Sequence, residues 1–201
     1  MIRILIAEDQ GMVRGALATL LDMEPDMEVV AQTGSGDQVL SLALANRPDV
    51  ALLDIEMPGG DGLAAAGALH AGLPGCVIII LTTFARPGYL RRAMEAGASG
   101  FLVKDGPVEA LAASIRRTVA GERVLDPQLA AAALSAGPNP LSPREREVLA
   151  AAVDGSGIAT IATRHFLSEG TVRNYLSSAI QKTGARNRIE AVRVAERLGW
   201  L

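Results

Sequence analysis

Four apolar, strand-length segments in the first half of the chain each run directly into a reactive polar residue. In an open parallel α/β sheet the carboxyl ends of the strands converge on one crevice, where ligands bind. We therefore expect the four endings to meet in space and to bring together three carboxylates, one hydroxyl and one ammonium. The endings are Glu8-Asp9 after 2–7, Asp54 after 50–53, Thr82 after 77–81 and Lys104 after 101–103.

Strand-like and helix-like segments alternate through the first 120 residues. The strand-like segments are almost continuously apolar, which favours a parallel sheet covered by helices on both faces. The pattern predicts a doubly wound α/β domain. The expected strands are 2–7, 29–31, 50–53, 76–81 and 100–103, and the expected helices are 11–23, 38–45, 63–69, 89–95 and 108–119.

The last third of the chain predicts a linker followed by a small all-helical domain. Gly137-Pro138-Asn139-Pro140 interrupts regular structure, and Asp126-Pro127 could start a short helix within the linker. Ser142-Pro143-Arg144-Glu145 has the form of a capping box that opens a helix. We expect helices at about 143–153, 158–166, 171–182 and 188–198, and parts of the chain at 1–120 (α/β domain), 121–140 (linker) and 141–201 (helical domain).

Charge is divided unevenly along the chain. Residues 1–137 hold 10 Lys+Arg against 16 Asp+Glu, whereas residues 138–201 hold 9 against 6. A basic tail on an acidic body favours a second domain that binds nucleic acid, although an ordinary solvated surface could carry the same charge. The single cysteine, Cys76, excludes an internal disulfide and fits a reducing compartment. Without a bilayer-spanning segment or a signal-peptide pattern, we expect a cytoplasmic protein with no membrane partner.

The predicted crevice has the chemistry of a phosphoryl acceptor. A carboxylate such as Asp54 can form an acyl phosphate. Glu8, Asp9 and Asp54, with a main-chain carbonyl and waters, suit Mg²⁺, which offsets the repulsion among the carboxylates. Thr82 supplies a hydroxyl donor, and Lys104, one of two lysines beside 17 arginines, supplies a second positive charge. Any one of these residues could be solvated or cap a helix, so the prediction rests on their combination.

The expected helix 171–182 has one apolar face and another face with short or cationic polar side chains suited to the major groove of DNA. Because helix 158–166 and a tight turn precede it, the segment predicts the recognition helix of a helix-turn-helix. A solvated helix face is the simpler alternative. The candidate groove-facing residues include Arg173, Asn174 and Ser177, and the candidate phosphate contacts are Lys182, Arg186 and Arg188.

The first 120 residues resemble the receiver domain of two-component response regulators. The resemblance implies a five-stranded flavodoxin-like fold and phosphorylation of Asp54 by a sensor histidine kinase. It also implies Mg²⁺ bound by Glu8, Asp9, Asp54 and the main-chain carbonyl of Glu56. In the implied switch, Thr82 moves to the phosphate while the ring of Phe101 turns inward. The matching residues are Glu8-Asp9, Asp54, Met57-Pro58-Gly59, Thr82 and Gly100-Phe101-Leu102-Val103-Lys104.

Residues 141–201 resemble the LuxR-type (NarL/FixJ) helix-turn-helix output domain. The resemblance implies DNA contacts by Arg173, Asn174 and Ser177, and dimerisation through helix 188–198. In that helix we name Ile189, Val192 and Ala195 as the dimerisation residues. The matching segments are Leu141-Ser142-Pro143-Arg144-Glu145, Ile161-Ala162, Leu167-Ser168, Gly170-Thr171-Val172-Arg173 and Lys182-Thr183-Gly184-Ala185-Arg186-Asn187-Arg188.

Three positions depart from the output-domain pattern. The chain has Ile158 where the family has a polar residue, Thr160 where it usually has Glu, and His165 where it has an apolar residue. We expect His165 to be neutral and either hydrogen-bonded or at the edge of the core. A pH-sensitive or partner-sensitive output domain is the alternative.

These features predict a transcriptional regulator rather than an enzyme. Phosphorylation of Asp54 is expected to promote a homodimer that binds double-stranded DNA. Similarity of segments 81–89 and 172–175 to a regulator of a membrane-lipid desaturase implies desaturase control.

Two alternatives remain. An enzyme with a nucleophilic Asp would need a second Asp where the chain has Glu56. A regulator switched by a ligand or partner protein, without phosphate, has no need of the complete set of crevice residues.

Overall fold

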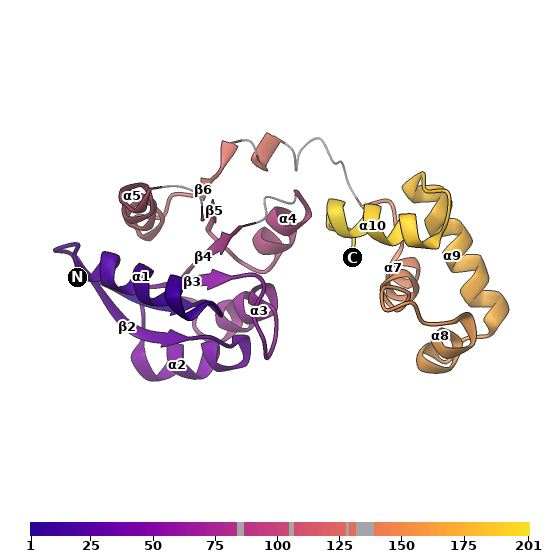
Figure 1. The fold of residues 1–201 in the computed structure, drawn as a ribbon, viewed down its shortest axis with the longest axis horizontal. Helices are drawn as coiled ribbons and strands as arrows, with labels where there is room; N and C mark the ends of the chain where they lie inside the picture. Colours follow the sequence, from indigo (N-terminus) through magenta and orange to yellow (C-terminus); the bar gives the residue numbers. More distant parts are fainter. Residues whose placement is uncertain (84–86, 105–106, 128, 132–138) are drawn as a thin grey trace. The chain divides into compact units, whose positions relative to one another are not determined.

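The computed structural model describes residues 1–83, 87–104, 107–127, 129–131 and 139–201. The chain divides into two compact units, which we call the sheet unit (mainly residues 1–130) and the helical unit (mainly residues 131–201) (Figure 1). The strands are β1 (Ile2–Ala7), β2 (Met27–Thr33), β3 (Val50–Asp54), β4 (Val77–Thr82), β5 (Gly100–Val103) and β6 (Val124–Leu125). The helices are α1 (Gly11–Asp22), η1 (a 3-10 turn, Gly36–Gln38), α2 (Val39–Asn46), α3 (Gly62–Gly72), α4 (Pro87–Glu95), α5 (Val108–Val119), α7 (Pro143–Ala150), α8 (Ile158–His165), α9 (Glu169–Thr183) and α10 (Arg188–Leu198).

The sheet unit is built on a parallel sheet with strand order β2-β1-β3-β4-β5-β6. The order changes direction between β1 and β3, which confirms the predicted doubly wound fold. β6 is an addition to the five expected strands and lies in the stretch expected to be linker. Its two residues pair with Gly100 and Phe101 of β5, so they cover part of an edge that would otherwise be exposed.

Helices cover both faces of this sheet. On one face, α1 and α5 enclose a core that includes Leu21, Ile79 and Ile115 (Figure 1). All five residues of β3 are buried, which requires cover on the opposite face as well. There α2 and α3 pack together and against the strands. The continuous burial of β3 explains why its sequence shows no polar alternation.

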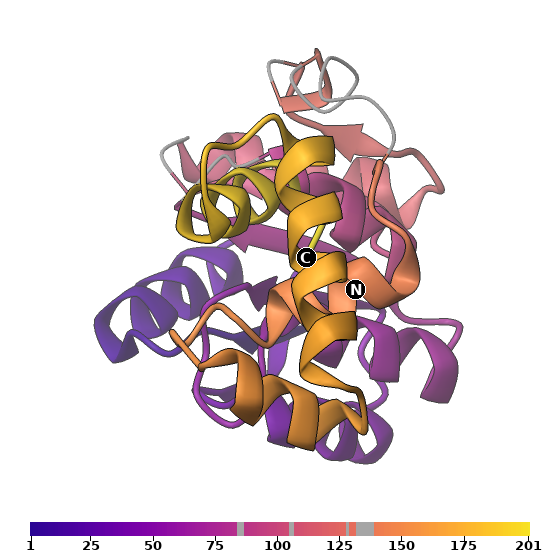
Figure 2. The same cartoon turned by 90° about the vertical axis from the view of Figure 1, so that its right-hand side faces the viewer.

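The helical unit packs α7 to α10 around a core of its own (Figure 2). Ser142 and Glu145 form both halves of the predicted capping box at the start of α7. Ser168 caps α9 by accepting a hydrogen bond from the Thr171 N–H. The predicted all-helical second domain is therefore confirmed. Among the described residues, no helix combines the length and the apolar character that a membrane crossing requires. The buried core residues are Leu141, Val148, Leu149, Ala152, Ile161, Ala162, Val172, Leu176, Ala179, Ala191, Val192, Ala195 and Trp200.

Candidate phosphoryl-acceptor and DNA-binding sites

The register of the sheet brings the reactive strand endings to one edge. Asp54, the last residue of β3, pairs with Leu81, and Thr82, the last residue of β4, pairs with Val103. The next residue, Lys104, donates its main-chain N–H to the carbonyl of Thr82 over 2.9 Å. The endings of these strands therefore lie in adjacent positions.

Three carboxylates converge at this edge. Ligand oxygens of Glu8, Asp9 and Asp54 lie within 4.8 Å of one another. Glu8 is 1% exposed and Asp54 is 6% exposed, whereas Asp9 is exposed to solvent. This all-oxygen donor set fits Mg²⁺, which binds carboxylates and keeps several waters. The exposed side chain of Asp9 leaves room for those waters.

Lys104 neutralises part of this negative charge. Its Nζ lies 2.5 Å from Oε2 of Glu8 and 3.1 Å from Oδ2 of Asp54. The other oxygen of Asp54, Oδ1, accepts a hydrogen bond from the Ile55 N–H at 2.8 Å. The ammonium pairs with two of the three carboxylates, so the cluster retains a negative charge that a divalent cation can offset. The Ile55 N–H and the Lys104 ammonium thus hold the carboxylate of Asp54 in one orientation.

The two predicted switch residues are both inside the sheet unit. Thr82 is 2% exposed and Phe101 is fully buried. Phe101 pairs with Ile80 on one side and with Leu125 on the other, so its main chain lies between β4 and β6. Glu56 follows β3 by two residues, and its side chain is exposed.

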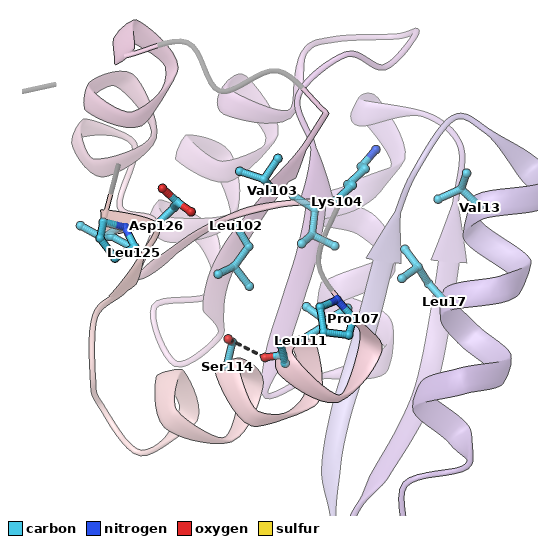
Figure 3. A pocket seen from close by; sticks show the side chains of 13 residues that line it. Val13, Leu17, Leu102, Val103, Lys104, Pro107, Leu111, Ser114, Leu125 and Asp126 are labelled. Carbon is cyan, nitrogen blue, oxygen red and sulfur yellow. Dashed lines mark hydrogen bonds between the residues drawn. The ribbon is translucent and has the colours of Figure 1, made fainter. Parts of the chain in front are cut away.

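A pocket of about 350 Å³ lies beside this crevice in the sheet unit. Figure 3 shows its wall, in which Leu17 of α1 faces Leu111 of α5 and Leu125 closes another side. The ammonium group of Lys104 points away from Leu111, toward its carboxylate partners. The Ser114 hydroxyl donates to the carbonyl of Ala110 at 2.7 Å. The pocket therefore presents a mainly apolar surface.

The predicted base-reading residues share one exposed face of α9. Arg173, Asn174 and Ser177 are all exposed. Arg173 pairs with Glu169 one helical turn earlier, with 2.6 Å between Nη2 and Oε2. This face can therefore reach a ligand without any rearrangement of the core.

The three predicted phosphate-binding residues differ in their surroundings. Arg186 is largely exposed and pairs with Glu190. Arg188 donates to the carbonyl of Ser156 at 3.0 Å and so supports the loop before α8. Lys182 is paired with Glu145 of α7.

Glu145 connects α7 to α9, a role that the sequence did not reveal. It is 5% exposed, and its Oε2 lies 2.7 Å from Nζ of Lys182, while its Oε1 accepts a 2.6 Å hydrogen bond from the Ser178 hydroxyl. Burial raises the pKa of Glu145, but the hydrogen bonds from Lys182, Ser178 and Ser142 outweigh that effect and lower the pKa to about 2. The capping box predicted the position of Glu145, but its partners lie more than 30 residues away.

The three named dimerisation residues of α10 fall into two groups. Ile189 is 62% exposed. Val192 and Ala195 lie in the core of the helical unit. A groove lined by Val153, Ile189 and Arg193, among others, runs beside the exposed Ile189. Only Ile189 of the three thus offers most of its side chain to a partner.

The three departures from the output-domain pattern also have distinct surroundings. Ile158 packs against the helical core, and Thr160 is exposed. His165 is half-buried, and its Nε2 is buried without a hydrogen-bond partner among the described residues. It therefore lies at the edge of the core, with one ring nitrogen unsatisfied.

Known proteins match both units of the chain. Residues 4–116 match the response regulator receiver domain, and residues 139–195 match the luxR family of bacterial regulatory proteins. The uncharacterized transcriptional regulatory protein YvfU of Bacillus subtilis is 49% identical over the full length of both chains. The transcriptional regulatory protein DesR of Bacillus subtilis is 48% identical over 100% of this chain and 99% of its own. The crystal structure of the response regulator ChrA, from a heme-sensing two-component system, is 34% identical with a TM-score of 0.58 over 100% of this chain and 98% of that one.

Proposed function

Because this chain belongs to the response regulators that join a receiver domain to a LuxR-type DNA-binding domain, we propose that phosphorylation of Asp54 controls its binding to DNA. This family consists of transcriptional regulators rather than enzymes. A receiver domain implies a histidine kinase as partner, and a LuxR-type domain implies double-stranded DNA. The observation that carries the proposal is the carboxylate of Asp54, 3.1 Å from the Lys104 ammonium and beside two further acids.

Asp54 is the proposed phosphoryl acceptor. A carboxylate oxygen of Asp54 attacks the phosphorus of a phosphohistidine on the kinase. The new P–O bond forms as the P–N bond breaks, and the electron pair stays on the imidazole, which takes up a proton. Lys104 stays close enough to bind an oxygen of the transferred group. Positioning and charge neutralisation of this kind account for most catalysis of phosphoryl transfer.

Mg²⁺ is the proposed cofactor, held by Glu8, Asp9, Asp54 and the main-chain carbonyl of Glu56. When bound, it neutralises negative charge on the phosphoryl oxygens. The three convergent carboxylates support this assignment.

Thr82 and Phe101 are the proposed switch. The hydroxyl of Thr82, at the end of β4, binds a phosphoryl oxygen and draws β4 toward Asp54. The full burial of Phe101 supports an inward position for its ring. A phenyl ring has no polar atom to hydrate, so this inward position is stable without a hydrogen-bond partner.

Dimerisation on the α1 and α5 side of the sheet unit is the proposed consequence of the switch. Met12 of α1 and Met23, which caps its end, are 89% and 75% exposed, and Val13 and Leu17 of the same helix line the apolar pocket between α1 and α5. Burial of such side chains against a second copy stabilises a dimer by removing apolar surface from water. Ile189 of α10 offers a second apolar contact, in the helical unit.

Paired recognition helices are the proposed DNA-reading element. Two copies of α9 would enter successive major grooves, about one helical turn apart. Arg173, Asn174 and Ser177 would contact bases, and Arg186 would contact phosphate. Lys182 and Arg188 can add to the positive potential while they keep their contacts within the helical unit. Control of a membrane-lipid desaturase stays a prediction. YvfU and DesR are two different regulators with nearly the same identity to this chain, so the similarity does not identify its target genes.

The proposal is tested by phosphorylation without a kinase. A small-molecule phosphodonor with Mg²⁺ should phosphorylate wild type at Asp54 and shift it toward dimer, as measured by intact mass spectrometry and analytical ultracentrifugation. Asp54→Asn should respond in neither assay, because its side chain cannot form an acyl phosphate. Asp37→Asn is the control, because Asp37 is an exposed carboxylate outside the cluster. A wild type that is phosphorylated but stays monomeric would contradict the dimer mechanism. A wild type that takes up no phosphate, and binds DNA equally well with and without the phosphodonor, would favour control by a ligand or partner protein.

A further inference from the structure

The exposed face of α9 begins with an acidic residue. Side chains one helical turn apart line this face, and α9 contains a single acid, Glu169, in its first position. The Ser168 hydroxyl accepts the hydrogen bond of the Thr171 N–H, so the cap of α9 is supplied without Glu169. The exposed residues in this row are Glu169, Arg173, Ser177 and Gln181.

Two ordinary roles are open to Glu169. A carboxylate in the first turn interacts favourably with the helix dipole, and a surface pair such as Glu169–Arg173 stabilises a helix modestly. Both side chains are about half exposed, so neither role is strong. The dipole interaction does not require the carboxylate to lie on the same face as Arg173 and Ser177, whereas the surface pair does.

The position of Glu169 matters once α9 lies in a major groove, as the proposed function requires. Residues at the start of a recognition helix contact base edges. A carboxylate there is repelled by DNA phosphates and by the acceptor atoms O6 and N7 of guanine. The N4 amino group of cytosine is a donor that a carboxylate can accept from, whereas arginine donates to O6 and N7 of guanine. Glu169 and Arg173 therefore suit the two partners of G·C base pairs.

We propose that Glu169 is a specificity-determining residue, which accepts a hydrogen bond from a cytosine N4 and positions Arg173 on a guanine. Its Oε2 is 2.6 Å from Nη2 of Arg173, so the carboxylate restricts the guanidinium before DNA arrives. Preorganisation of this kind reduces the entropy lost on binding. The inference rests on the proposed function, because it requires α9 to read DNA.

The test is selection of binding sites from a random duplex DNA library by the full chain with phosphodonor and Mg²⁺. Wild type should enrich a motif with cytosine at one position of each half-site. Glu169→Ala should lose the preference at that position by roughly 5- to 150-fold and weaken the guanine preference set by Arg173, with the other positions unchanged. Glu169→Gln should move the preference toward adenine, because glutamine pairs with N6 and N7 of adenine.

Glu147→Gln is the matched control. Glu147 lies on α7 and forms an exposed pair with Arg144 at 2.8 Å, so its substitution makes the same charge change away from α9. This variant should enrich the wild-type motif. Fluorescence of Trp200, the single tryptophan, checks that each variant is folded.

The two possible failures are distinguishable. Identical motifs from wild type and Glu169→Ala would overturn the role of Glu169 and leave the proposed function intact. Equal loss of preference at every position in Glu169→Ala would also overturn it, since that pattern indicates a structural role. A wild type that enriches no motif would overturn sequence-specific DNA binding, and this inference with it.

Discussion

At the scale of single residues, both lysines of the chain pair with a nearly fully buried glutamate. Lys104 pairs with Glu8 in the sheet unit, and Lys182 pairs with Glu145 in the helical unit. A lysine ammonium is a compact point charge, whereas arginine presents a planar fork that needs more space. All other Lys/Arg positions of the chain are arginine, so lysine occurs at the two sites where the cation must fit beside a buried glutamate. Lys182 was predicted as a phosphate contact, and the structure gives it an additional partner that links α9 to α7.

The Glu145 pair predicts a pH dependence of stability. Its pKa is lowered from 4.5 to about 2 in the folded state, so the stabilisation is present above the unfolded pKa and is lost as the pH falls from about 4.5 toward 2. The loss should reach about 3 kcal/mol at most. Glu145→Gln should lower the free energy of unfolding at pH 7 by roughly 2 kcal/mol and flatten its pH dependence. Urea unfolding followed by Trp200 fluorescence measures both quantities. A variant with the wild-type pH profile would contradict the assignment.

His165 predicts a gain in stability on substitution. Its Nε2 is buried without a partner among the described residues, and an unsatisfied buried polar atom costs about 1–3 kcal/mol. His165→Leu should therefore raise the free energy of unfolding of the helical unit by about 1 kcal/mol. His70→Leu is the control, because His70 is exposed and lies in the sheet unit. Loss of stability in His165→Leu would show that contacts of the imidazole ring outweigh the unsatisfied nitrogen.

Equal DNA affinity of wild type and His165→Leu from about pH 5.5 to 8 would contradict a pH-sensitive output domain.

At the scale of an element, α8 ends on an unusual residue. Phe166 has φ 56° and ψ 44°, in the left-handed region, and its side chain is 96% exposed. This conformation costs a non-glycine residue about 1 kcal/mol, and asparagine tolerates it better than phenylalanine. Phe166→Asn should thus stabilise the helical unit by about 0.5–1 kcal/mol, as measured by thermal unfolding. The exposed ring loses no packing, so an unchanged or lower unfolding temperature would refute the strain argument.

Phe166 also lies in the turn before α9, the proposed recognition helix. Its exposed ring is free to contact a ligand, and the same variant tests whether it does. If Phe166→Asn is more stable but binds DNA less tightly, the ring contacts the DNA or a partner bound there. Equal affinity would limit the residue to its role as the cap of α8.

At the scale of the whole molecule, the proposed switch predicts reciprocal coupling between the two units. If dimerisation of the phosphorylated chain raises its DNA affinity by a factor, DNA must favour dimerisation of that chain by the same factor. We expect a factor of roughly 5 to 150. Fluorescence anisotropy with labelled DNA duplex measures the change in DNA affinity. Ultracentrifugation with and without duplex measures the change in the dimerisation equilibrium. Asp54→Asn should show no response to phosphodonor in either. Unequal factors at equilibrium would indicate a further state outside this scheme.

The sequence by itself determined the local features of this protein. Apolar strands ending in Asp54, Thr82 and Lys104 predicted the sheet and its crevice. The carboxyl ends of parallel strands lie at the same edge of a sheet, so these side chains had to lie there too. Ser142 and Glu145 predicted the start of α7, because a capping box involves residues only three positions apart.

Only the tertiary structure decided which side chains meet across elements. Nothing local in the sequence pairs Lys182 with Glu145, because the packing of α7 against α9 sets that contact. Similarly, the apolar residues of α10 look equivalent along the chain, yet Val192 is buried and Ile189 is exposed. The strand β6 forms because the neighbouring edge of β5 offers hydrogen-bonding partners. Sequence patterns follow the period of a single element, whereas these contacts depend on how two elements pack together.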